Sequence, residues 1–484
     1  MVLVLLLLLL SVFAWRHIPT LQFQGEGFYY FTRMEQTLNL KSIISPLQEY
    51  RKHYDAFAIS LFYLIGPIFK GQVSLYMWLM FIFMMLIDVV FYILVRVVTG
   101  SKLPAAVAFI LFSLNFIGQY DMYSGGGYQY FVQRGILLLT LFVSFIFLHK
   151  YVASKKMGFF IISLVLYLMS IMMGFFGTWF LAPFIFYPLF KKRLWLAAPF
   201  LVGNYLIIKD SSYSFPQDSI VELLFHKTGF ITTGVIHQLT ALTLPFGLNK
   251  QLTQMTIHSI SDNNWPYIFG PILVLLYGGG IILVKKSYPK GIDLALTALA
   301  SLLSMLFFNL YLNPSSVLND LGPSRYYYYP FSMLALFWSL VVASIFKTSK
   351  LKLKAVVFVI MIFWVIENMF AIKLAVKDVY QKHQNNYDTI SYLKKWSLQM
   401  HEKPSYLILP YNFGAYGGEF AKRFYVNQAS YVGIERLSEI DYQDLAKRKV
   451  DPRRLFVLHY DETSDTVVDQ TDKWRKYLYQ LENP

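Results

Sequence analysis

Cysteine is absent from the 484 residues, and only 15% of them are charged. Without cysteine the chain can form no disulfide framework, no thiolate-bound zinc site and no thiol nucleophile. Disorder is also excluded, because disordered chains are polar and highly charged, whereas 56% of these residues are apolar. A soluble globule could not bury so many apolar residues, so the composition indicates a polytopic membrane protein.

Positive charge is in excess, because 43 Lys and Arg residues face only 28 Asp and Glu residues, which gives a formal net charge of +15. In a soluble domain this excess would favour nucleic acid as a partner. In a membrane protein it marks cytoplasmic connections between spans. We therefore expect the lipid bilayer, and not nucleic acid, as the partner of the basic residues.

Apolar runs recur along the first 372 residues, and eleven of them are predicted to be transmembrane helices. Several are shorter than the roughly 17–25 residues that usually span the hydrocarbon core. A further run, Ala56–Phe69, has only 14 residues and is predicted to lie in the interface or to re-enter. The eleven runs are 1–15, 74–97, 103–118, 135–152, 157–174, 179–190, 194–208, 266–284, 292–312, 330–346 and 354–372.

Five connections between these runs are basic and almost free of acids. The positive-inside rule places all five in the cytoplasm, together with the N-terminus. They share one side only if 56–69 does not cross the membrane; the alternative is that 56–69 crosses and another run does not. The basic residues are Arg96, Lys102, Lys150, Lys155, Lys156, Lys191, Lys192, Arg193, Lys285, Lys286, Lys290, Lys347, Lys350, Lys352 and Lys354.

The composition changes after residue 372. Residues 1–372 are predicted to form a transmembrane domain with outward loops at 16–73, 119–134, 209–265 and 313–329. Residues 373–484 contain a helix-like stretch at 376–400 and strand-like runs at 405–409 and 455–459, which suit one small extracytoplasmic α/β domain. The expected fold class is a polytopic α-helical membrane protein of about eleven transmembrane helices that carries this domain.

Two of the outward loops each place one acid among glycines and aromatic residues. The segment after the first span reads QGEGFYYFTR and contains Glu26, and the loop near 120 reads GQYDMYSGGGYQY and contains Asp121. Glycine permits close approach of a ligand to the chain. A carboxylate at the membrane boundary suits general-base work or binding of a hard cation such as Mg²⁺ or Mn²⁺. The alternative for each acid is a solvated loop residue.

Basic residues near the same boundary suit a phosphate group. His53 follows Arg51 and Lys52, Arg134 follows the second loop, and Arg325 precedes Tyr326 and three more tyrosines. A guanidinium binds phosphate oxygens in a bidentate manner. The alternatives are anchors for anionic lipid headgroups and, for the tyrosines, an interfacial aromatic belt.

These motifs resemble those of the GT-C superfamily of membrane glycosyltransferases, which use polyprenyl-phosphate-linked sugars. The layout of residues 1–372 is similar to that of protein O-mannosyltransferases, lipid A aminoarabinose transferases and oligosaccharyltransferase catalytic subunits. In that superfamily an acid follows the first span, and Glu26 occupies this place. Asp121 matches the second acid, His53 lies where a juxtamembrane basic motif is found, and Arg325-Tyr326 matches an arginine-tyrosine pair before a late span.

The resemblance implies a hexosyl or pentosyl transferase of the cell envelope. It would move a sugar on the outer membrane face, with inversion, from a polyprenyl-phosphate donor to a glycan, lipid or protein acceptor. Glu26 would act as the general base, and Asp121 would orient the acceptor or hold a divalent cation. Phosphate binding would fall to Arg325, with His53 or Arg134 in support, and Tyr326 would add a further contact to the substrate. The tail lacks the Trp-Trp-Asp-Tyr-Gly signature of oligosaccharyltransferases, which disfavours transfer to asparagine.

Two other readings remain open at the level of the sequence. A transporter or flippase would carry charged sites at mid-depth and two related halves; Asp88 in the middle of a span favours it, but the halves show no repeat. A non-catalytic scaffold would bind a partner through its outer domain. It predicts that Glu26 and Asp121 lie far apart.

Overall fold

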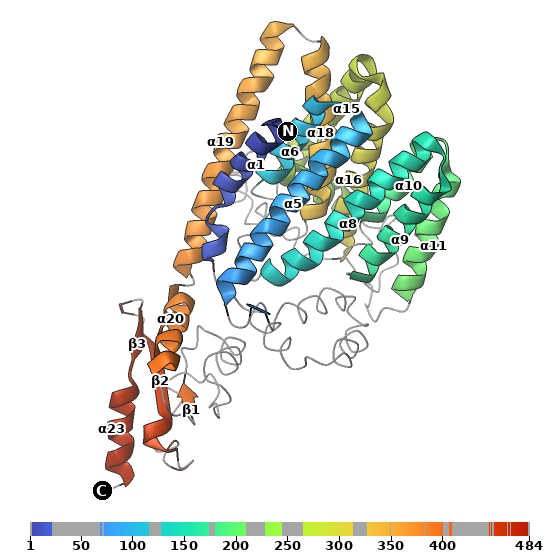
Figure 1. The fold of residues 1–484 in the computed structure, drawn as a ribbon. Helices are drawn as coiled ribbons and strands as arrows, with labels where there is room; N and C mark the ends of the chain where they lie inside the picture. The colour runs from blue at the N-terminus through green and yellow to red at the C-terminus, as the bar shows by residue number, and fades with distance from the viewer. Residues whose placement is uncertain are drawn as a thin grey trace.

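The computed structural model describes most of the chain outside several connecting segments. It covers residues 2–21, 68–69, 72–115, 127–173, 180–209, 228–243, 265–312, 327–348, 350–382, 384–399, 406–408, 445, 447, 450–461, 463–464 and 466–482. A bundle of helices is followed by a smaller domain, which contains a three-stranded sheet and lies beyond one end of the bundle (Figure 1).

Each of the eleven predicted apolar runs coincides with a helix. Seven of the described helices are long and apolar enough to cross a membrane, so the chain is an integral membrane protein. The other four runs form apolar helices of 10–17 residues, and the count of eleven spans stays a prediction. The helices are α1 (Val2–Trp15), α5 (Val73–Thr99), α6 (Lys102–Ser113), α8 (Gly127–Ser154), α9 (Met157–Met173), α10 (Leu181–Phe190), α11 (Ala198–Lys209), α15 (Trp265–Ser287), α16 (Ile292–Leu312), α18 (Tyr328–Thr348) and α19 (Leu351–Lys382).

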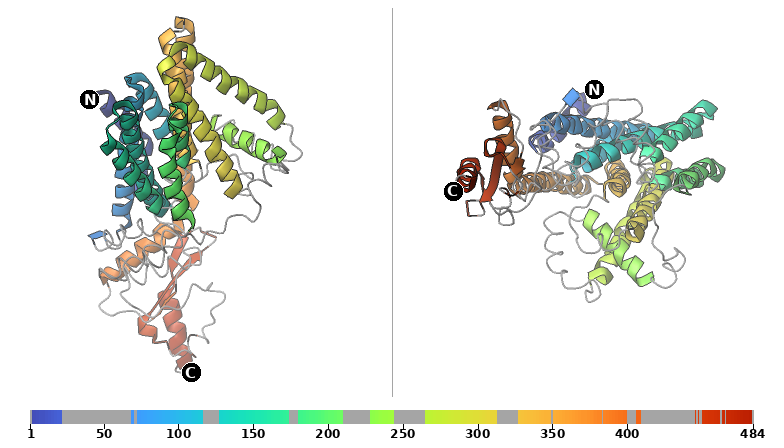
Figure 2. Two further views of the ribbon diagram at one scale, coloured as in Figure 1. Left: turned by 90° about the vertical axis from the view of Figure 1, so that its right-hand side faces the viewer. Right: turned by 90° about the horizontal axis from the view of Figure 1, so that it is seen from below.

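Helix α18 lies at the centre of the bundle, and α19 lies at its margin (Figures 1 and 2). Nearly every side chain of α18 from Tyr328 to Val342 is buried. In contrast, Val359 and Ile366 of α19 are 63% and 62% exposed. Lipid tails solvate apolar side chains as well as a protein core does, so a marginal helix can be apolar on all faces.

Tyr288 brings three of the basic connections together at one end of the bundle. Its hydroxyl donates a hydrogen bond to the carbonyl oxygen of Thr99, at the turn between α5 and α6. The ammonium of Lys347, at the turn between α18 and α19, lies 5.4 Å from the centre of the Tyr288 ring. Partial burial raises the pKa of Tyr288, so its hydroxyl remains a hydrogen-bond donor.

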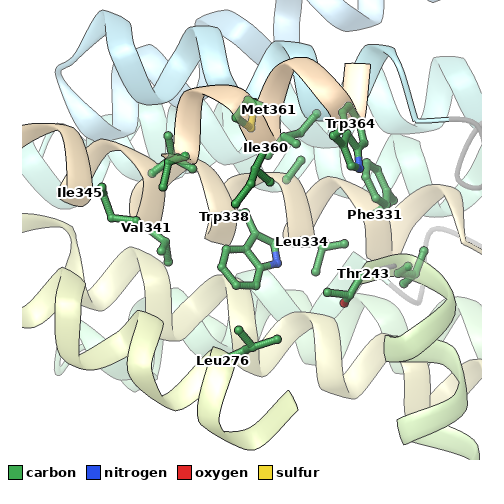
Figure 3. Close-up of a pocket in the computed structure, with 15 residues that line it drawn as sticks. Thr243, Leu276, Phe331, Leu334, Trp338, Val341, Ile345, Ile360, Met361 and Trp364 are labelled. Carbon is green, nitrogen blue, oxygen red and sulfur yellow. The ribbon is translucent and has the colours of Figure 1, made fainter. Parts of the chain in front are cut away.

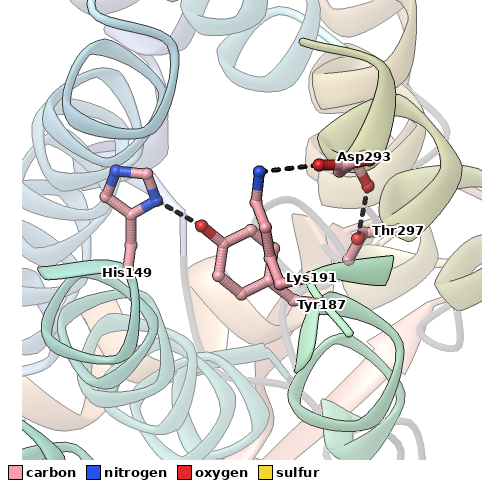
Figure 4. Close-up of polar contacts among 5 residues, drawn as sticks. All are labelled: His149, Tyr187, Lys191, Asp293 and Thr297. Atoms are coloured by element: carbon pink, nitrogen blue, oxygen red, sulfur yellow. Dashed lines mark hydrogen bonds and ion pairs between the residues drawn. The ribbon is translucent and has the colours of Figure 1, made fainter. Parts of the chain in front are cut away.

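The other two basic connections join the same end (Figure 4). Lys191, after α10, forms an ion pair of 2.7 Å with Asp293 at the start of α16. Arg193 donates a hydrogen bond of 3.0 Å to the carbonyl oxygen of Val152 near the end of α8. The five connections therefore share one end of the bundle, as their charge predicted, and we call this the basic end.

The chain leaves α1 and enters α5 at the opposite end, which we call the loop end. The 27 residues of α5, roughly 40 Å at 1.5 Å per residue, separate Val73 from the basic end. Helix α1 ends beside the start of α5 (Figure 1). No net change of side occurs between the two helices, as expected if 56–69 does not cross. Residues 56–67 themselves lie outside the described part of the chain.

Three of the predicted outward loops contain residues that are helical in the structure. Helix α8 begins at Gly127, inside the predicted loop 119–134, and α18 begins inside 313–329. Within 209–265, the structure shows a helix, α13 (Thr228–Thr243). Helix α13 packs against α15 and α16. Its side chain Gln238 is buried and donates a hydrogen bond of 2.9 Å to the Leu306 carbonyl oxygen.

The predicted domain boundary at residue 372 falls inside α19, which continues to Lys382. Residues 373–382 contain neither proline nor glycine, so nothing in the sequence interrupts the helix. Helix α20 (Gln384–Gln399) follows directly. The rings of Tyr380 and Tyr387 lie 4.4 Å apart and hold the two helices together.

The C-terminal domain is built on the strands β1 (Tyr406–Ile408), β2 (Leu455–Asp461) and β3 (Thr466–Asp469), in that order. Strand β1 runs parallel to β2, and β3 runs antiparallel to it. Helix α23 (Thr471–Glu482) packs Trp474 and Leu478, one turn apart, into the apolar core. The first two strands confirm the sequence prediction, whereas β3 was not predicted.

Candidate functional site

An apolar groove of about 420 Å³ lies on α18, between α15 and α19 (Figure 3). Leu334 and Val341 of α18 form its floor and are buried. Leu276 of α15 and Ile360 of α19 form its sides and are 45% and 58% exposed. All four residues belong to membrane-spanning helices. The groove therefore opens sideways toward the bilayer.

The groove follows α18 through most of the membrane. Its lining on α18 runs from Phe331 to Ile345, which is roughly 21 Å of helix at 1.5 Å per residue. Phe331 lies one turn from Tyr327, at the loop end, and Ile345 lies close to the basic end. An apolar groove of this length and volume suits one extended hydrocarbon chain.

One wall of the groove carries a hydroxyl that is already paired. Thr243, at the end of α13, lines the groove, and its Oγ1 lies 2.9 Å from the hydroxyl of Tyr277 on α15. The ring of Tyr277 packs against Trp338, with ring centres 5.5 Å apart. Because the two hydroxyls satisfy each other, the wall offers an apolar and aromatic surface to a ligand.

The segments that hold the two predicted carboxylates start from one place. The indole Nε1 of Trp15, the last residue of α1, donates a hydrogen bond of 2.7 Å to the carbonyl oxygen of Ser113, the last residue of α6. The chain continues from Trp15 toward Glu26 and from Ser113 toward Asp121. The bond therefore joins the two helix ends from which these segments start.

The segment that holds Arg325 starts from the same region. Tyr328, three residues after Arg325, packs on Phe112 of α6 with ring centres 5.8 Å apart. Phe180, at the start of α10, lies 6.4 Å from the ring of Tyr329. These rings belong to one aromatic cluster inside the bundle, which contains Phe91, Phe112, Phe142, Phe180, Tyr328 and Tyr329.

The predicted site residues themselves are not placed by the structure. Glu26, Asp121, His53, Arg325 and Tyr326 lie outside the described residues, and Arg134 lies on α8 with a side chain that is not described. Among the described residues, no group of three or more His, Asp or Glu side chains could hold a metal ion. The described part of the chain thus provides the groove and the anchors, and the predicted chemistry stays a prediction.

Asp88, the acid predicted at mid-span, pairs with a neighbouring helix. It is 1% exposed, and its Oδ2 accepts a hydrogen bond of 2.9 Å from the hydroxyl of Ser11 on α1. Its Oδ1 has no hydrogen-bond partner among the described residues. This contact gives Asp88 a structural hydrogen-bond role between α1 and α5.

The groove was not predicted from the sequence. Its lining residues are Ala, Val, Ile, Leu, Met and aromatic residues within the predicted apolar runs, apart from Leu242 and Thr243 of α13. Such residues are typical of lipid-facing and buried positions alike. Only the packing of α15, α18 and α19 distinguishes groove from lipid-facing surface.

No family model matches the chain, and no curated protein matches it. Among solved structures, it is similar to the Archaeoglobus fulgidus oligosaccharyltransferase tethered through a disulfide bond to an acceptor peptide containing the NVT sequon. That comparison has a TM-score of 0.47 and 15% identity, and covers 87% of this chain and 62% of the other.

Two further structures of the same oligosaccharyltransferase give similar values. The apo form has a TM-score of 0.46 at 13% identity, and covers 87% of this chain and 63% of the other. The complex with Zn and sulfate has a TM-score of 0.46 at 13% identity, over 91% and 63% of the two chains. The chain thus spans less than two thirds of the length of these structures. They belong to one of the protein classes that the sequence motifs resemble.

Proposed function

We propose that this protein is a membrane glycosyltransferase that moves a sugar from a polyprenyl-phosphate donor to an acceptor at the loop end. The observation that carries the proposal is the position of the apolar groove. It begins at Phe331, six residues from Arg325, beside the joined anchors of the segments that hold Glu26 and Asp121. A hydrocarbon chain in the groove would bring its headgroup to these three residues.

The reach of the chain supports this grouping. An extended chain advances at most about 3.6 Å per residue, so Arg325 lies within roughly 7 Å of Tyr327, measured between Cα atoms. By the same rule Asp121 lies within roughly 22 Å of Asn115, and Glu26 within roughly 18 Å of Leu21. These limits keep each residue near the described residue from which its segment starts.

The donor would bind in two parts. Its isoprenoid chain would enter the groove sideways from the bilayer and lie along α18, where burial of apolar surface stabilises it. Its phosphate would lie at the mouth, where the guanidinium of Arg325 can bind two oxygens at once. His53 and Arg134 would add positive charge, and Tyr326 would pack at the membrane boundary.

The transfer step would use the loop carboxylates. Glu26 takes the proton from an acceptor hydroxyl, whose oxygen then forms a bond to the anomeric carbon of the sugar. The bond between that carbon and the phosphate oxygen breaks, and the polyprenyl phosphate leaves with the electron pair, so the anomeric configuration inverts. Asp121 would orient the acceptor or hold Mg²⁺ or Mn²⁺ beside the leaving phosphate.

The proposed location is a cell membrane with the loop end facing outward. The five basic connections share the other end, and the positive-inside rule assigns that end to the cytoplasm. The C-terminal domain lies beyond the loop end in Figure 1, where it would meet a glycan, lipid or peptide acceptor in the cell envelope.

The test is sugar transfer by the purified protein in lipid vesicles with a panel of radiolabelled polyprenyl-phosphate sugars. Glu26→Gln should abolish transfer, because an amide cannot take the proton. Glu367→Gln is the matched control, since Glu367 lies on α19, outside the groove lining. Transfer by Glu26→Gln at the parent rate would show that Glu26 is not the base.

A second variant tests the groove. Ala335 is 1% exposed and lies in the groove floor, so Ala335→Trp should fill the groove and weaken donor binding. The control is Val359→Trp, at a position of α19 that is 63% exposed and does not line the groove. Equal donor affinity in the two variants would remove the groove from the donor site.

The transporter reading loses its main support in the structure. Asp88 is engaged with Ser11, and no charged residue is found among the described residues that line the groove. A flippase must carry a polar headgroup across the bilayer, so its path needs polar partners at mid-depth. Fluorescent-lipid scrambling in protein-containing vesicles measures this activity directly, and we expect the rate of protein-free vesicles.

A further inference from the structure

Helix α1 has no amphipathic pattern that could fix its orientation. Its sequence, VLVLLLLLLSVFAW, is apolar around almost the whole circumference, and half of its side chains are exposed, including Leu5 and Leu9 at 57% and 55%. In lipid, apolar side chains gain little by turning from the bilayer to a neighbouring helix. The hydrophobic effect alone therefore leaves the rotation and the depth of α1 poorly determined.

Two hydrogen bonds supply the missing constraint. Ser11 and Trp15 carry the sole hydrogen-bonding side chains of the helix, and both are completely buried. Ser11 donates to Asp88 of α5 at 2.9 Å, and Trp15 donates to the Ser113 carbonyl oxygen of α6 at 2.7 Å. The two donors lie one turn apart on the face that also buries Leu7, at spacings of four residues.

The two bonds together define one position of the helix. Their acceptors belong to different helices, so a rotation that preserves one bond breaks the other. A hydrogen bond also weakens steeply when its heavy atoms separate beyond about 3.2 Å, which limits sliding along the helix axis.

The Trp15 hydrogen bond also lies where the chain leaves α1 and continues toward Glu26 of the proposed site. After Trp15 the described chain continues through the buried residues Ile18 and Leu21, which pack beside α5, toward Glu26. We propose that Ser11 and Trp15 are positioning residues, which fix α1 and with it the start of the segment that leads to Glu26. The inference rests on the proposed function, since that function assigns Glu26 to the reaction.

The absence of cysteine from the native chain permits a direct measurement. Thr20→Cys and Lys156→Cys place nitroxide labels at two exposed positions, after α1 and at the turn between α8 and α9. Pulsed electron spin resonance on protein in nanodiscs then reports the position of the end of α1 relative to the bundle. Ser11→Ala and Trp15→Phe should shift or broaden the label distance, and Ser11→Thr, which keeps the hydroxyl, should restore the parent distribution.

Matched controls remove the same chemical groups elsewhere. Ser344→Ala removes a buried hydroxyl that donates to the Leu340 carbonyl oxygen within α18, and Trp195→Phe alters an indole that is 62% exposed. Both should leave the label distance unchanged. In sugar transfer, Ser11→Ala and Trp15→Phe should lower kcat by roughly 10- to 100-fold, since a displacement of about 1 Å is enough for such a loss. The KM for the donor should change little, because the groove is untouched.

Two results would overturn the inference. A parent-like label distance in both Ser11→Ala and Trp15→Phe would show that the bonds do not fix α1. A changed distance with parent-like kcat would show that the position of α1 does not matter for transfer. Neither outcome depends on Glu26→Gln, whose full activity would refute the proposed function separately.

Discussion

The Nζ atom of Lys191 lies 2.7 Å from Oδ2 of Asp293, and this ion pair joins the end of α10 to the start of α16. Both side chains are about one third exposed, at 31% and 33%. Solvent screens such a pair, so its contribution should be small, in the range of about 0–1 kcal/mol. The ion pair therefore lies at the basic end of the bundle but adds little to the stability of the protein.

A double-mutant cycle with Lys191→Met and Asp293→Asn measures this contribution. We expect a coupling free energy below about 1 kcal/mol that decreases further as salt is added. The measurement is thermal unfolding of the purified protein in detergent at two ionic strengths. A larger coupling free energy that does not change with salt would indicate a pair shielded from water.

The carboxyl group of Asp88 should be replaceable by a neutral group of the same shape. Asp88→Asn keeps an oxygen that can accept the hydrogen bond of Ser11, so the melting temperature should stay close to that of the parent. Asp88→Leu removes the acceptor and leaves the buried Ser11 hydroxyl unpaired, which should cost about 1 kcal/mol. Equal loss of stability in both variants would show that Asp88 needs its charge.

Three consecutive glycines in α15 should respond differently to substitution. A Cβ atom at Gly280 would lie 3.0 Å from Phe337 and Val341 of α18, whereas at Gly279 it would meet nothing within 4 Å. Gly280→Leu should therefore destabilise the protein by about 1–3 kcal/mol through overpacking. Gly279→Leu is the matched control and should be nearly neutral. Similar unfolding midpoints for the two variants would mean that α15 and α18 can separate freely.

The two ends of the bundle should be labelled from opposite sides of the membrane. In the cysteine-free chain, Thr20→Cys should react with a membrane-impermeant maleimide added to intact cells. Lys156→Cys, at the basic end, should react only after the membrane is permeabilised. Labelling of both positions from one side would contradict the proposed orientation and, with it, the placement of the site outside.

The sequence predicts the positions of the helices well because length and hydrophobicity define a membrane span. All eleven apolar runs coincide with helices, and the Tyr406–Ile408 and Leu455–Asp461 strands follow their predicted positions. The last predicted span ends at residue 372, whereas α19 continues for ten more residues to Lys382. The change in polarity after Ile372 predicts where the apolar part of the helix ends and not where the helix itself ends. A continuous helix can leave the membrane without any break in its sequence.

The contacts between helices could not be predicted from the sequence. Asp88 and Ser11 are 77 residues apart, and neither shows its partner through periodicity, because α1 and α5 are apolar on every face. The groove is hidden for the same reason: Leu276 and Ile360 resemble ordinary lipid-facing residues. The roles of Glu26, Asp121 and Arg325 are predicted from the sequence alone. The structure shows the contacts between the helix ends from which their segments start.

Helix α19 gives the groove a mechanical connection to the C-terminal domain. It is continuous over 32 residues, and at 1.5 Å per residue Trp364 lies roughly 20 Å, and Lys382 roughly 47 Å, from its first residue at the basic end. A rigid tilt about that end would move the far tip more than twice as far as the groove wall. A displacement of the groove wall at Trp364 by such a tilt would therefore move the end of α19, to which the C-terminal domain is attached, by more than twice the distance.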